Sequence, residues 1–558
     1  MPSRRRFLAS GAATVAALGL PAPLAACAAA PGAPPMPEAA APTGPVTVGD
    51  IASAETVAGL RFRPEQRALM LDDVNERLAT LATIREHEPA NGVAPLVPGA
   101  ERRRRRSDPA PMRTYSPPQP SGAARPADRD LAFASIDELG ALLRGGVVTS
   151  VELTELALER LRRFDPQLKA VVTRMEERAM RTARERDDEL RRGRLRGPLH
   201  GIPYGAKDLL AARGAPTTWG ATPYREQEID DDAAVVAMLE RAGAVLVAKL
   251  SLGALAWGDV WFGGRTNSPW NVEAGSSGSS AGPGAAVAAG LVPFAIGSET
   301  YGSIVSPSTR NGITGLRPTF GAVDTAGAMA LAWSLDKLGP MTRSAADAGL
   351  VLAALTFTPP QDPAALTIGH DPSHWDDPAD AAALDALRAA GATLVAAALP
   401  EDDRAAAVMD VTVAAEAAAA FDGLTRSGGV DALVRQERYA WPNVFRHGRL
   451  IPAVEYVNAQ RIRRQLSSET EAVLREIDAW VGPSFAGSQL ALTNLTGHPA
   501  VCVPSGFDAV EGAGADDPRR TPRSITFVSR LQGDASALRA AELYQSATDW
   551  HSRRPPVS

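Results

Sequence analysis

The sequence predicts an α/β protein, on three observations. Residues 244–250 (AVLVAKL) and 291–297 (LVPFAIG) have the length and apolar composition of short buried strands, with helical or Gly/Ser-rich sequence between them. A chain of 558 residues can bury a large core, as three or four domains or as one large α/β unit. Its 45% hydrophobic and 22% charged residues are typical of a globular protein rather than a membrane-embedded or disordered chain.

The first 27 residues are predicted to be an export signal. Residues 3–8 (SRRRFL) form a twin-arginine pattern, and an Ala/Gly-rich run then leads to residues 24–27 (LAAC), which have the form of a lipobox. We therefore expect a mature chain that begins at a lipidated Cys27, on the outer side of the cytoplasmic membrane or in the periplasm. The alternative is a plain cleaved signal in which Cys27 is incidental. No other segment reaches about 18 uncharged apolar residues, so no transmembrane helix is expected.

Residues 28–129 are expected to connect this signal to the main body. Residues 28–45 are rich in Ala and Pro and are typical of a tether. Residues 63–87 have a helical period and predict an N-terminal arm that packs on the body. Residues 95–130 contain several prolines and five consecutive arginines at 102–106. A solvated linker explains these arginines better than binding to anionic lipid head groups.

The main body is predicted to begin at Asp130. Ser135, with Glu138 three residues later, forms a capping box for a helix that ends near Gly145. A second helix is predicted from Thr149 through Arg163.

The charged residues exclude one class of partner and single out four positions. The net charge of −6 does not indicate the basic surface that proteins use to bind nucleic acid. Almost all the basic residues are arginine, and the four lysines are Lys169, Lys207, Lys249 and Lys337. Since arginine cannot lose its proton in a protein, positions that keep lysine are enriched in sites that need a neutral amine.

Residues 275–290 (GSSGSSAGPGAAVAAG) are the richest candidate for chemistry. A glycine-rich turn that enters a helix, here near Pro283, can hold an anion with its backbone N–H groups. The segment lacks the GxxxxGK[ST] pattern of a phosphate-binding loop and also lacks GxGxxG. What remains is a cluster of serines on a loop, any of which could be reactive.

Two further segments complete the candidate site. Residues 297–304 (GSETYGSI) leave a strand and place Ser303 directly after a glycine, where consecutive N–H groups can hold an oxyanion. Residues 201–208 (GIPYGAKD) place Lys207 at the end of an apolar strand.

These three segments together resemble the amidase signature family, whose motifs include a strand-end G-[IV]-P-x-x-x-K-D, a Gly/Ser loop and a nucleophile segment ending in G-S-[IV]. The match continues in residues 315–321, 339–344 and 494–500 and covers about residues 130–555. The resemblance implies one large domain over this range, with a mixed, twisted β-sheet core covered by helices on both sides.

The resemblance also implies roles for individual residues. Ser303 corresponds to the nucleophile and Lys207 to the terminal base. Four serines compete for the bridging position, and the family spacing to Ser303 selects Ser279, preceded by a cis peptide bond from Gly278. Ser280 and Glu299 resemble supporting residues that hydrogen-bond the loop and the lysine.

The chemistry of this trio is reasonable in its own terms. A serine hydroxyl is a poor nucleophile until a base removes its proton, and His200 is the only histidine near these segments in sequence. A buried neutral lysine can be that base, with a second serine as the proton relay. The N–H groups of Thr300, Tyr301, Gly302 and Ser303 are then the expected oxyanion hole.

Other conspicuous residues have structural explanations. Lys249 is expected to form a structural pair, His498 to be a turn residue and Cys502 to be a buried strand residue. His370 and His374 have zinc-like spacing, but Pro372 lies between them and no Glu follows His370, so no metal site and no cofactor are predicted. Four tryptophans near the site segments could line an apolar pocket or pack in the core: Trp219, Trp257, Trp261 and Trp270.

The sequence therefore predicts an exported amidase that hydrolyses the C–N bond of a small-molecule amide. It binds no nucleic acid, is held at the membrane by a lipid on Cys27, and has no predicted oligomeric state. Alternatives are an amidotransferase-like subunit of the same fold and a non-catalytic surface-binding lipoprotein. The Ala-rich residues 357–480 are expected to supply much of the substrate pocket.

Overall fold

The computed structural model describes residues 45–96, 124–356, 366–514 and 516–558. Residues 47–558 form one compact unit. The predicted signal, the lipobox with Cys27, the tether and the arginines 102–106 lie outside the described residues. The predicted domain boundary near Asp130 remains a prediction.

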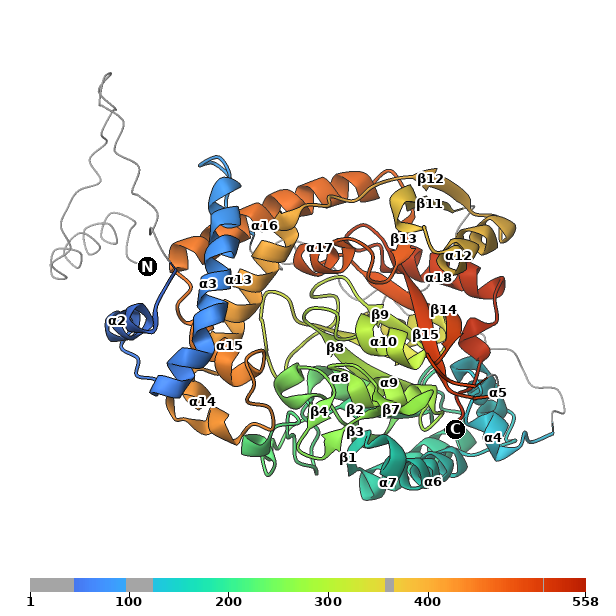
Figure 1. Cartoon of the computed structure of the whole chain (residues 1–558). Coiled ribbons are helices and arrows are strands. Elements are labelled where there is room, and N and C mark those ends of the chain that lie inside the picture. Colours follow the sequence, from blue (N-terminus) through green and yellow to red (C-terminus); the bar gives the residue numbers. More distant parts are fainter. Residues whose placement is uncertain (1–44, 97–123, 357–365, 515) are drawn as a thin grey trace, which may run out of the picture. The chain divides into compact units, whose positions relative to one another are not determined.

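A mixed sheet, with 11 strands in the described part of the chain, organises the fold (Figure 1). The strand order is β1-β3-β2-β8-β10-β9-β14-β15-β13-β11-β12. Strand β2 is parallel to β3 and β8, and β11 is parallel to β12 and β13, whereas the other neighbours are antiparallel. The strands are β1 (Val171–Arg174), β2 (Pro203–Lys207), β3 (Val245–Leu250), β8 (Phe294–Glu299), β9 (Thr314–Arg317), β10 (Lys337–Thr342), β11 (Thr367–His370), β12 (Thr393–Ala396), β13 (Ala479–Pro483), β14 (Ala500–Ala509) and β15 (Arg520–Val528).

Each face of the sheet has its own hydrophobic core. In β8, Phe294 and Ile296 belong to one core cluster and Ala295, which lies between them, belongs to another. Successive side chains of a strand point to opposite faces, so the two clusters lie on opposite sides of the sheet. One cluster includes residues of α8 (Ala234–Arg241), α11 (Ala345–Thr356) and α18 (Asp534–Ser546), and the other includes residues of α6 (Ser150–Leu168), α7 (Glu176–Arg191) and α9 (Ala281–Ala288). The predicted α/β fold, with helices on both sides of a mixed sheet, is confirmed.

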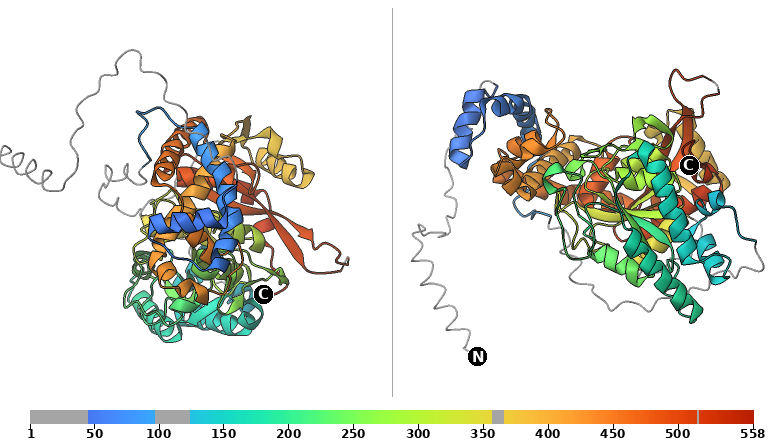
Figure 2. Two further views of the ribbon diagram at one scale, coloured as in Figure 1. Left: turned by 60° about the vertical axis from the view of Figure 1, so that its left-hand side comes forward. Right: turned by 90° about the horizontal axis from the view of Figure 1, so that it is seen from below.

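The predicted N-terminal arm is also helical. Helix α3 (Pro64–Glu86) forms it and packs against α13 (Asp403–Ala420), α15 (Trp441–Gly448) and α16 (Ala453–Leu474). Helix α2 (Val48–Ala58), which precedes it, was not predicted. Figure 2 shows α3, in blue, along these orange helices from two further directions. Leu81 and Ile84 of α3 are buried in a third core cluster with residues of α13 and α16.

Local sequence signals predicted the start of one helix correctly and the start of one strand incorrectly. Ser135 caps α5 (Ile136–Arg144) through the predicted capping box with Glu138. The strand predicted at residues 291–297 begins instead at Phe294. Gly290, with φ at +63°, ends α9, and Leu291 still donates to the carbonyl of Ala286, so the first residues of the apolar run close a helix.

The remaining elements are short or connect the layers. None of the helices in the described ranges is both long and apolar enough to cross a bilayer. The other helices and strands are α4 (Asp128–Leu131), α10 (Val305–Asn311), α12 (Pro378–Ala389), α14 (Asp422–Arg426), α17 (Gln489–Thr496), β4 (Val260–Trp261), β5 (Gly264–Arg265), β6 (Asn267–Ser268), β7 (Asn271–Gly275), and the 3-10 turns η2 (Thr222–Tyr224), η3 (Ala254–Ala256), η4 (Pro372–His374), η5 (Gly429–Ala432) and η6 (Trp550–Ser552).

Candidate active site

The sheet brings the three predicted site segments together. Strands β2 and β8 are parallel neighbours, so Lys207 at the end of β2 and the turn that follows β8 lie at the same edge. The serine loop joins them there, because the N–H of Ser280 donates to the carbonyl of Ser303 at 3.1 Å. The peptide bond between Gly278 and Ser279 is cis.

Lys207 is fully buried among hydroxyl groups. Its Nζ lies 2.8 Å from Ser279 Oγ, 3.0 Å from Ser280 Oγ and 2.8 Å from Ser298 Oγ. Burial holds the pKa of Lys207 well below its ordinary value, against the opposing influence of Asp336 and Glu299. The ammonium form has no carboxylate in hydrogen-bond contact among the described residues, so the site favours a neutral amine.

The hydrogen bonds around Lys207 also decide which hydroxyl can give it a proton. The Ser280 hydroxyl donates to the carbonyl of Ser298 at 3.0 Å, so toward Lys207 it can only accept. Ser279 and Ser298 have no such second acceptor among the described residues. A neutral lysine has one nitrogen lone pair and can therefore accept one hydrogen bond, from the hydroxyl of Ser279 or of Ser298. Sequence reasoning missed Ser298, although it lies within the predicted nucleophile segment.

Ser303 lies on the turn between β8 and α10. It is half-buried, and its hydroxyl makes no hydrogen bond to another described residue, Ser279 included. Gly302 has φ at +80°, a conformation that favours glycine, and Tyr301 beside it is half-exposed. The N–H groups of Tyr301, Gly302 and Ser303 donate to no other backbone group in the described ranges, so they remain available to a ligand.

Glu299 holds this turn rather than the lysine, which corrects part of its expected role. Its carboxylate accepts from the N–H groups of Ile304 at 2.7 Å and Val305 at 2.9 Å. It also accepts from Arg317 at 2.9 Å and Asn494 at 2.8 Å. Burial acts to raise the pKa of Glu299, but Arg317 and the other donors hold it below its ordinary value. An ionised Glu299 thus fixes the backbone directly after Ser303.

Asp336 is a second anchor, which the sequence did not single out. The hydroxyl of Thr300 donates to its Oδ1 at 2.6 Å, and the N–H groups of Leu331 and Ala332 donate to its Oδ2 at 2.7 and 3.0 Å. Asp336 therefore ties the start of the Ser303 turn to the loop before β10. The available sequence signal was its position next to Lys337, one of the four lysines.

The other conspicuous residues make structural contacts. Lys249 pairs with Asp208 at 2.6 Å, and both side chains are fully buried. His498 is buried between Thr496 at 2.6 Å and Glu471 at 3.0 Å. Cys502 is buried in β14. The four tryptophans pack against aromatic neighbours, in the pairs Trp219–Tyr224, Trp257–Trp441, Trp261–Phe262 and Trp270–Phe507.

A cavity of about 340 Å³ opens beside the site. Ser298 and Thr300 form part of its wall, and every described residue that lines it lies between positions 209 and 338. None of the described residues between 357 and 480 lines this cavity, and the expectation that they supply much of the substrate pocket stays a prediction. The described part of that segment forms α12 to α16 and the strands β11 and β12. Helices α13, α15 and α16 pack against α3.

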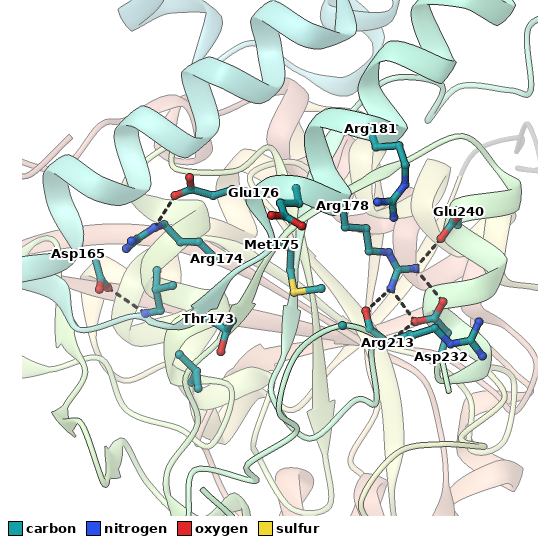
Figure 3. Close-up of a pocket in the computed structure, with 14 residues that line it drawn as sticks. Asp165, Thr173, Arg174, Met175, Glu176, Arg178, Arg181, Arg213, Asp232 and Glu240 are labelled. Atoms are coloured by element: carbon teal, nitrogen blue, oxygen red, sulfur yellow. Dashed lines mark hydrogen bonds and ion pairs between the residues drawn. The ribbon is translucent and has the colours of Figure 1, made fainter. Parts of the chain in front are cut away.

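A larger cavity, of about 860 Å³, lies at the edge strand β1 and includes none of the predicted site residues. Figure 3 shows that its central cation, Arg178, reaches toward Asp232 and Glu240, to which it is ion-paired. The charge of Arg178 is thus balanced by these two carboxylates. We assign no catalytic role to this larger cavity, which lies apart from the predicted site residues.

One group of possible metal ligands occurs in the described residues. Asp371, His374 and Glu401 place a ligand atom each within 4.8 Å of one another, and His374 Nε2 lies 3.1 Å from Glu401. Exposed clusters of this kind are common without a metal, and none of the three residues lines the cavity beside Ser298. We assign no metal role to them.

The sequence and the fold match known proteins over most of the chain. Residues 152–379 match the Amidase family model. The chain is 31% identical to a glutamyl-tRNA(Gln) amidotransferase subunit from Chloroflexus aggregans, over 77% of this chain and 99% of that protein. It is 33% identical to the putative amidase AmiD of Mycobacterium tuberculosis, over 76% of this chain and 96% of that one.

Solved structures agree with this assignment. The peptide amidase from Stenotrophomonas maltophilia is 28% identical, with a TM-score of 0.65, over 76% of this chain and 98% of that chain. The chain belongs to the amidase signature family. It is an amidase-class hydrolase.

Proposed function

We propose that the protein hydrolyses a small-molecule amide through Ser303, Ser279 and Lys207. The observation that carries this proposal is the fully buried Lys207, whose amine contacts three serine hydroxyls. Burial lowers its pKa, so a lysine in this place can accept a proton that an ordinary surface lysine could not.

The proposed reaction uses these three groups in turn. Lys207 takes the proton of Ser279, which in turn takes the proton of Ser303 as that hydroxyl attacks the amide carbonyl. The N–H groups of Thr300, Tyr301, Gly302 and Ser303 stabilise the tetrahedral oxyanion, and one such donor contributes about 3 kcal/mol in hydrolases. Ser279 then returns the proton to the nitrogen as the C–N bond breaks. Water, activated by the same relay, attacks the acyl-serine ester and releases the carboxylate.

An active-site probe tests this proposal directly. A fluorophosphonate that reacts with activated serines is expected to label the protein at Ser303, located by peptide mass spectrometry. The labelled protein should also lose its activity against a panel of aryl, alkyl and peptide amides. A label on another serine, with activity lost in parallel, would assign the nucleophile elsewhere.

Replacement of the relay serine should separate amides from esters. Ser279→Ala is expected to lower kcat/KM for amides by several orders of magnitude, because the path from Lys207 to Ser303 is broken. Activated esters should lose less, since their leaving groups need little protonation. The measurement is kcat/KM for an amide and an activated ester that share one acyl group.

Two neighbours on the same loop provide matched controls. Ser277 Oγ bonds to Ser306 Oγ at 2.6 Å, and Ser276 Oγ donates to the carbonyl of Ser277, so neither hydroxyl contacts Lys207. Ser276→Ala and Ser277→Ala should therefore cost much less than Ser279→Ala. A larger loss in either control would contradict the assignment of Ser279. An equal loss for ester and amide would reduce Ser279 to a positioning role.

We also propose that the protein is exported and held at the membrane by a lipid on Cys27. The supporting observations are the twin-arginine pattern at residues 3–8 and the lipobox at 24–27. Cys27→Ser is expected to move the protein from the membrane fraction to the soluble fraction, because the acyl chains would supply the anchor. Cell fractionation with immunoblotting measures this. Unchanged membrane association would point instead to an uncleaved signal or to the arginines 102–106.

A further inference from the structure

Two ionisable side chains hold one residue of the loop that leads into β10. The N–H and the hydroxyl of Ser334 donate to the two carboxylate oxygens of Glu416, at 2.9 and 2.5 Å. The hydroxyl and the carbonyl of Ser334 accept from the guanidinium group of Arg463, at 2.9 and 2.8 Å. All three polar groups of this loop residue are therefore bonded to Glu416 of α13 and Arg463 of α16.

Burial makes these contacts resist displacement of the loop. Arg463 is 1% exposed and Glu416 is 6% exposed. A movement of Ser334 would take two hydrogen bonds from each of these side chains. A buried ionic group that loses its hydrogen-bond partners destabilises a protein far more than an exposed one does. The loop is thus held firmly at Ser334.

The held loop supports the start of the turn between β8 and α10. Asp336 follows Ser334 by two residues, and its carboxyl group accepts from the hydroxyl of Thr300 at 2.6 Å. The N–H groups of Leu331 and Ala332, which precede Ser334, donate to the same carboxyl group. Because Thr300 begins the turn that carries the proposed oxyanion donors, the place of this turn depends on the loop around Ser334.

Arg463 also reaches the segment that supports the end of the same turn. Its Nε donates to the carbonyl of Leu495 at 2.5 Å. Leu495 follows Asn494 in α17, and Asn494 donates to Glu299 at 2.8 Å. Glu299 in turn accepts from the N–H groups of residues 304 and 305. One guanidinium group therefore joins the supports of both ends of the turn.

We propose that Arg463 and Glu416 are positioning residues for amide hydrolysis, which set the place of the oxyanion donors through Ser334 and Leu495. Neither side chain lines the cavity beside Ser298, so both act through other groups. A misplacement of catalytic groups by about 1 Å can cost about 10²-fold in rate. The inference rests on the proposed function, because it takes the turn to carry the nucleophile and the oxyanion hole.

Arg463→Lys tests the positioning role. Lysine keeps the charge but cannot reproduce the planar fork, so kcat is expected to fall about tenfold or more, with KM little changed. An amide and an activated ester that share one acyl group should lose equally, because both form the oxyanion. The measurements are kcat and KM per site, with the sites counted by exhaustive fluorophosphonate labelling. An unchanged kcat, or a change in KM alone, would overturn the inference.

Arg461 provides the matched control on the same helix. It lies two residues from Arg463 and donates to three backbone carbonyls of the N-terminal arm, at Pro89, Ala90 and Val93. Arg461→Lys should lower the thermal unfolding midpoint but leave kcat close to that of the wild type. Equal losses of kcat in the two variants would show a general effect of α16 on stability and would overturn the positioning role.

A milder variant keeps the test decisive if Arg463→Lys does not fold. Ser334→Ala removes one half-buried hydroxyl and leaves the N–H and carbonyl contacts, so it is expected to fold and to lower kcat severalfold. Thr300→Val removes the hydroxyl that joins the turn to Asp336. In a Thr300→Val background, Ser334→Ala should therefore have little further effect on kcat. Fully multiplicative losses would overturn the path through Asp336.

Failure of the proposed function has a different signature. It would be seen as hydrolysis that persists in Ser303→Ala, whatever the effect of Arg463→Lys. An inactive Ser303→Ala variant together with a fully active Arg463→Lys variant would overturn the positioning role alone.

Discussion

Ser303→Ala is expected to abolish amide hydrolysis and leave the fold intact. The substitution removes the attacking oxygen, and groups that act as one catalytic unit typically lose about 10⁴-fold or more in kcat when a member is removed. Ser303 is half-buried and its hydroxyl bonds to no other described residue, so the native structure loses little. Steady-state kinetics measure the loss, and a thermal unfolding midpoint close to that of the wild type confirms the fold.

A nearby serine provides the comparison. Ser306 lies on the same segment, half-buried, and bonds to Ser277 rather than to the lysine. Ser306→Ala should keep most of the wild-type rate. If Ser303→Ala retains more than a trace of activity, Ser303 is not the nucleophile.

Lys207→Arg is expected to be as inactive as Lys207→Ala. Arginine keeps the positive charge and the reach, but it does not lose its proton at neutral pH and so cannot act as the base. The same substitution at the exposed Lys169 should leave the activity unchanged and is the matched control. An active Lys207→Arg variant would contradict the neutral-base role.

The pH dependence of kcat/KM of the wild-type enzyme should depend on the protonation state of Lys207. The folded-state pKa of Lys207 is lowered, so the catalytically competent neutral form persists to a lower pH than in a free lysine. As the pH falls through this lowered pKa, the amine becomes protonated and kcat/KM should fall with it. Kinetics between mildly acidic and alkaline pH measure this, and a rate that rises toward acid would exclude Lys207 as the base.

Several elements followed from the sequence because their signals are local. The capping box of Ser135 and Glu138 and the period of residues 63–87 depend on neighbours within a few positions, and the structure has α5 and α3 there. The site motifs could also be found in the sequence, since a lysine at the end of a strand and a serine-rich turn are both short, local patterns. The export signal at residues 1–27 is likewise a matter of sequence alone, and it stays a prediction.

Only the tertiary structure decided how these groups act on one another. Glu299 contacts Ile304, Arg317 and Asn494, and the asparagine comes from a distant part of the chain. Likewise, the residues that line the cavity come from between positions 209 and 338 rather than from 357–480. The physical reason is that hydrogen-bond partners and desolvation depend on which strands become neighbours, and a one-dimensional pattern does not carry that pairing. The sequence by itself predicted which groups are reactive, and the packing of β2 against β8 decided which serines surround Lys207.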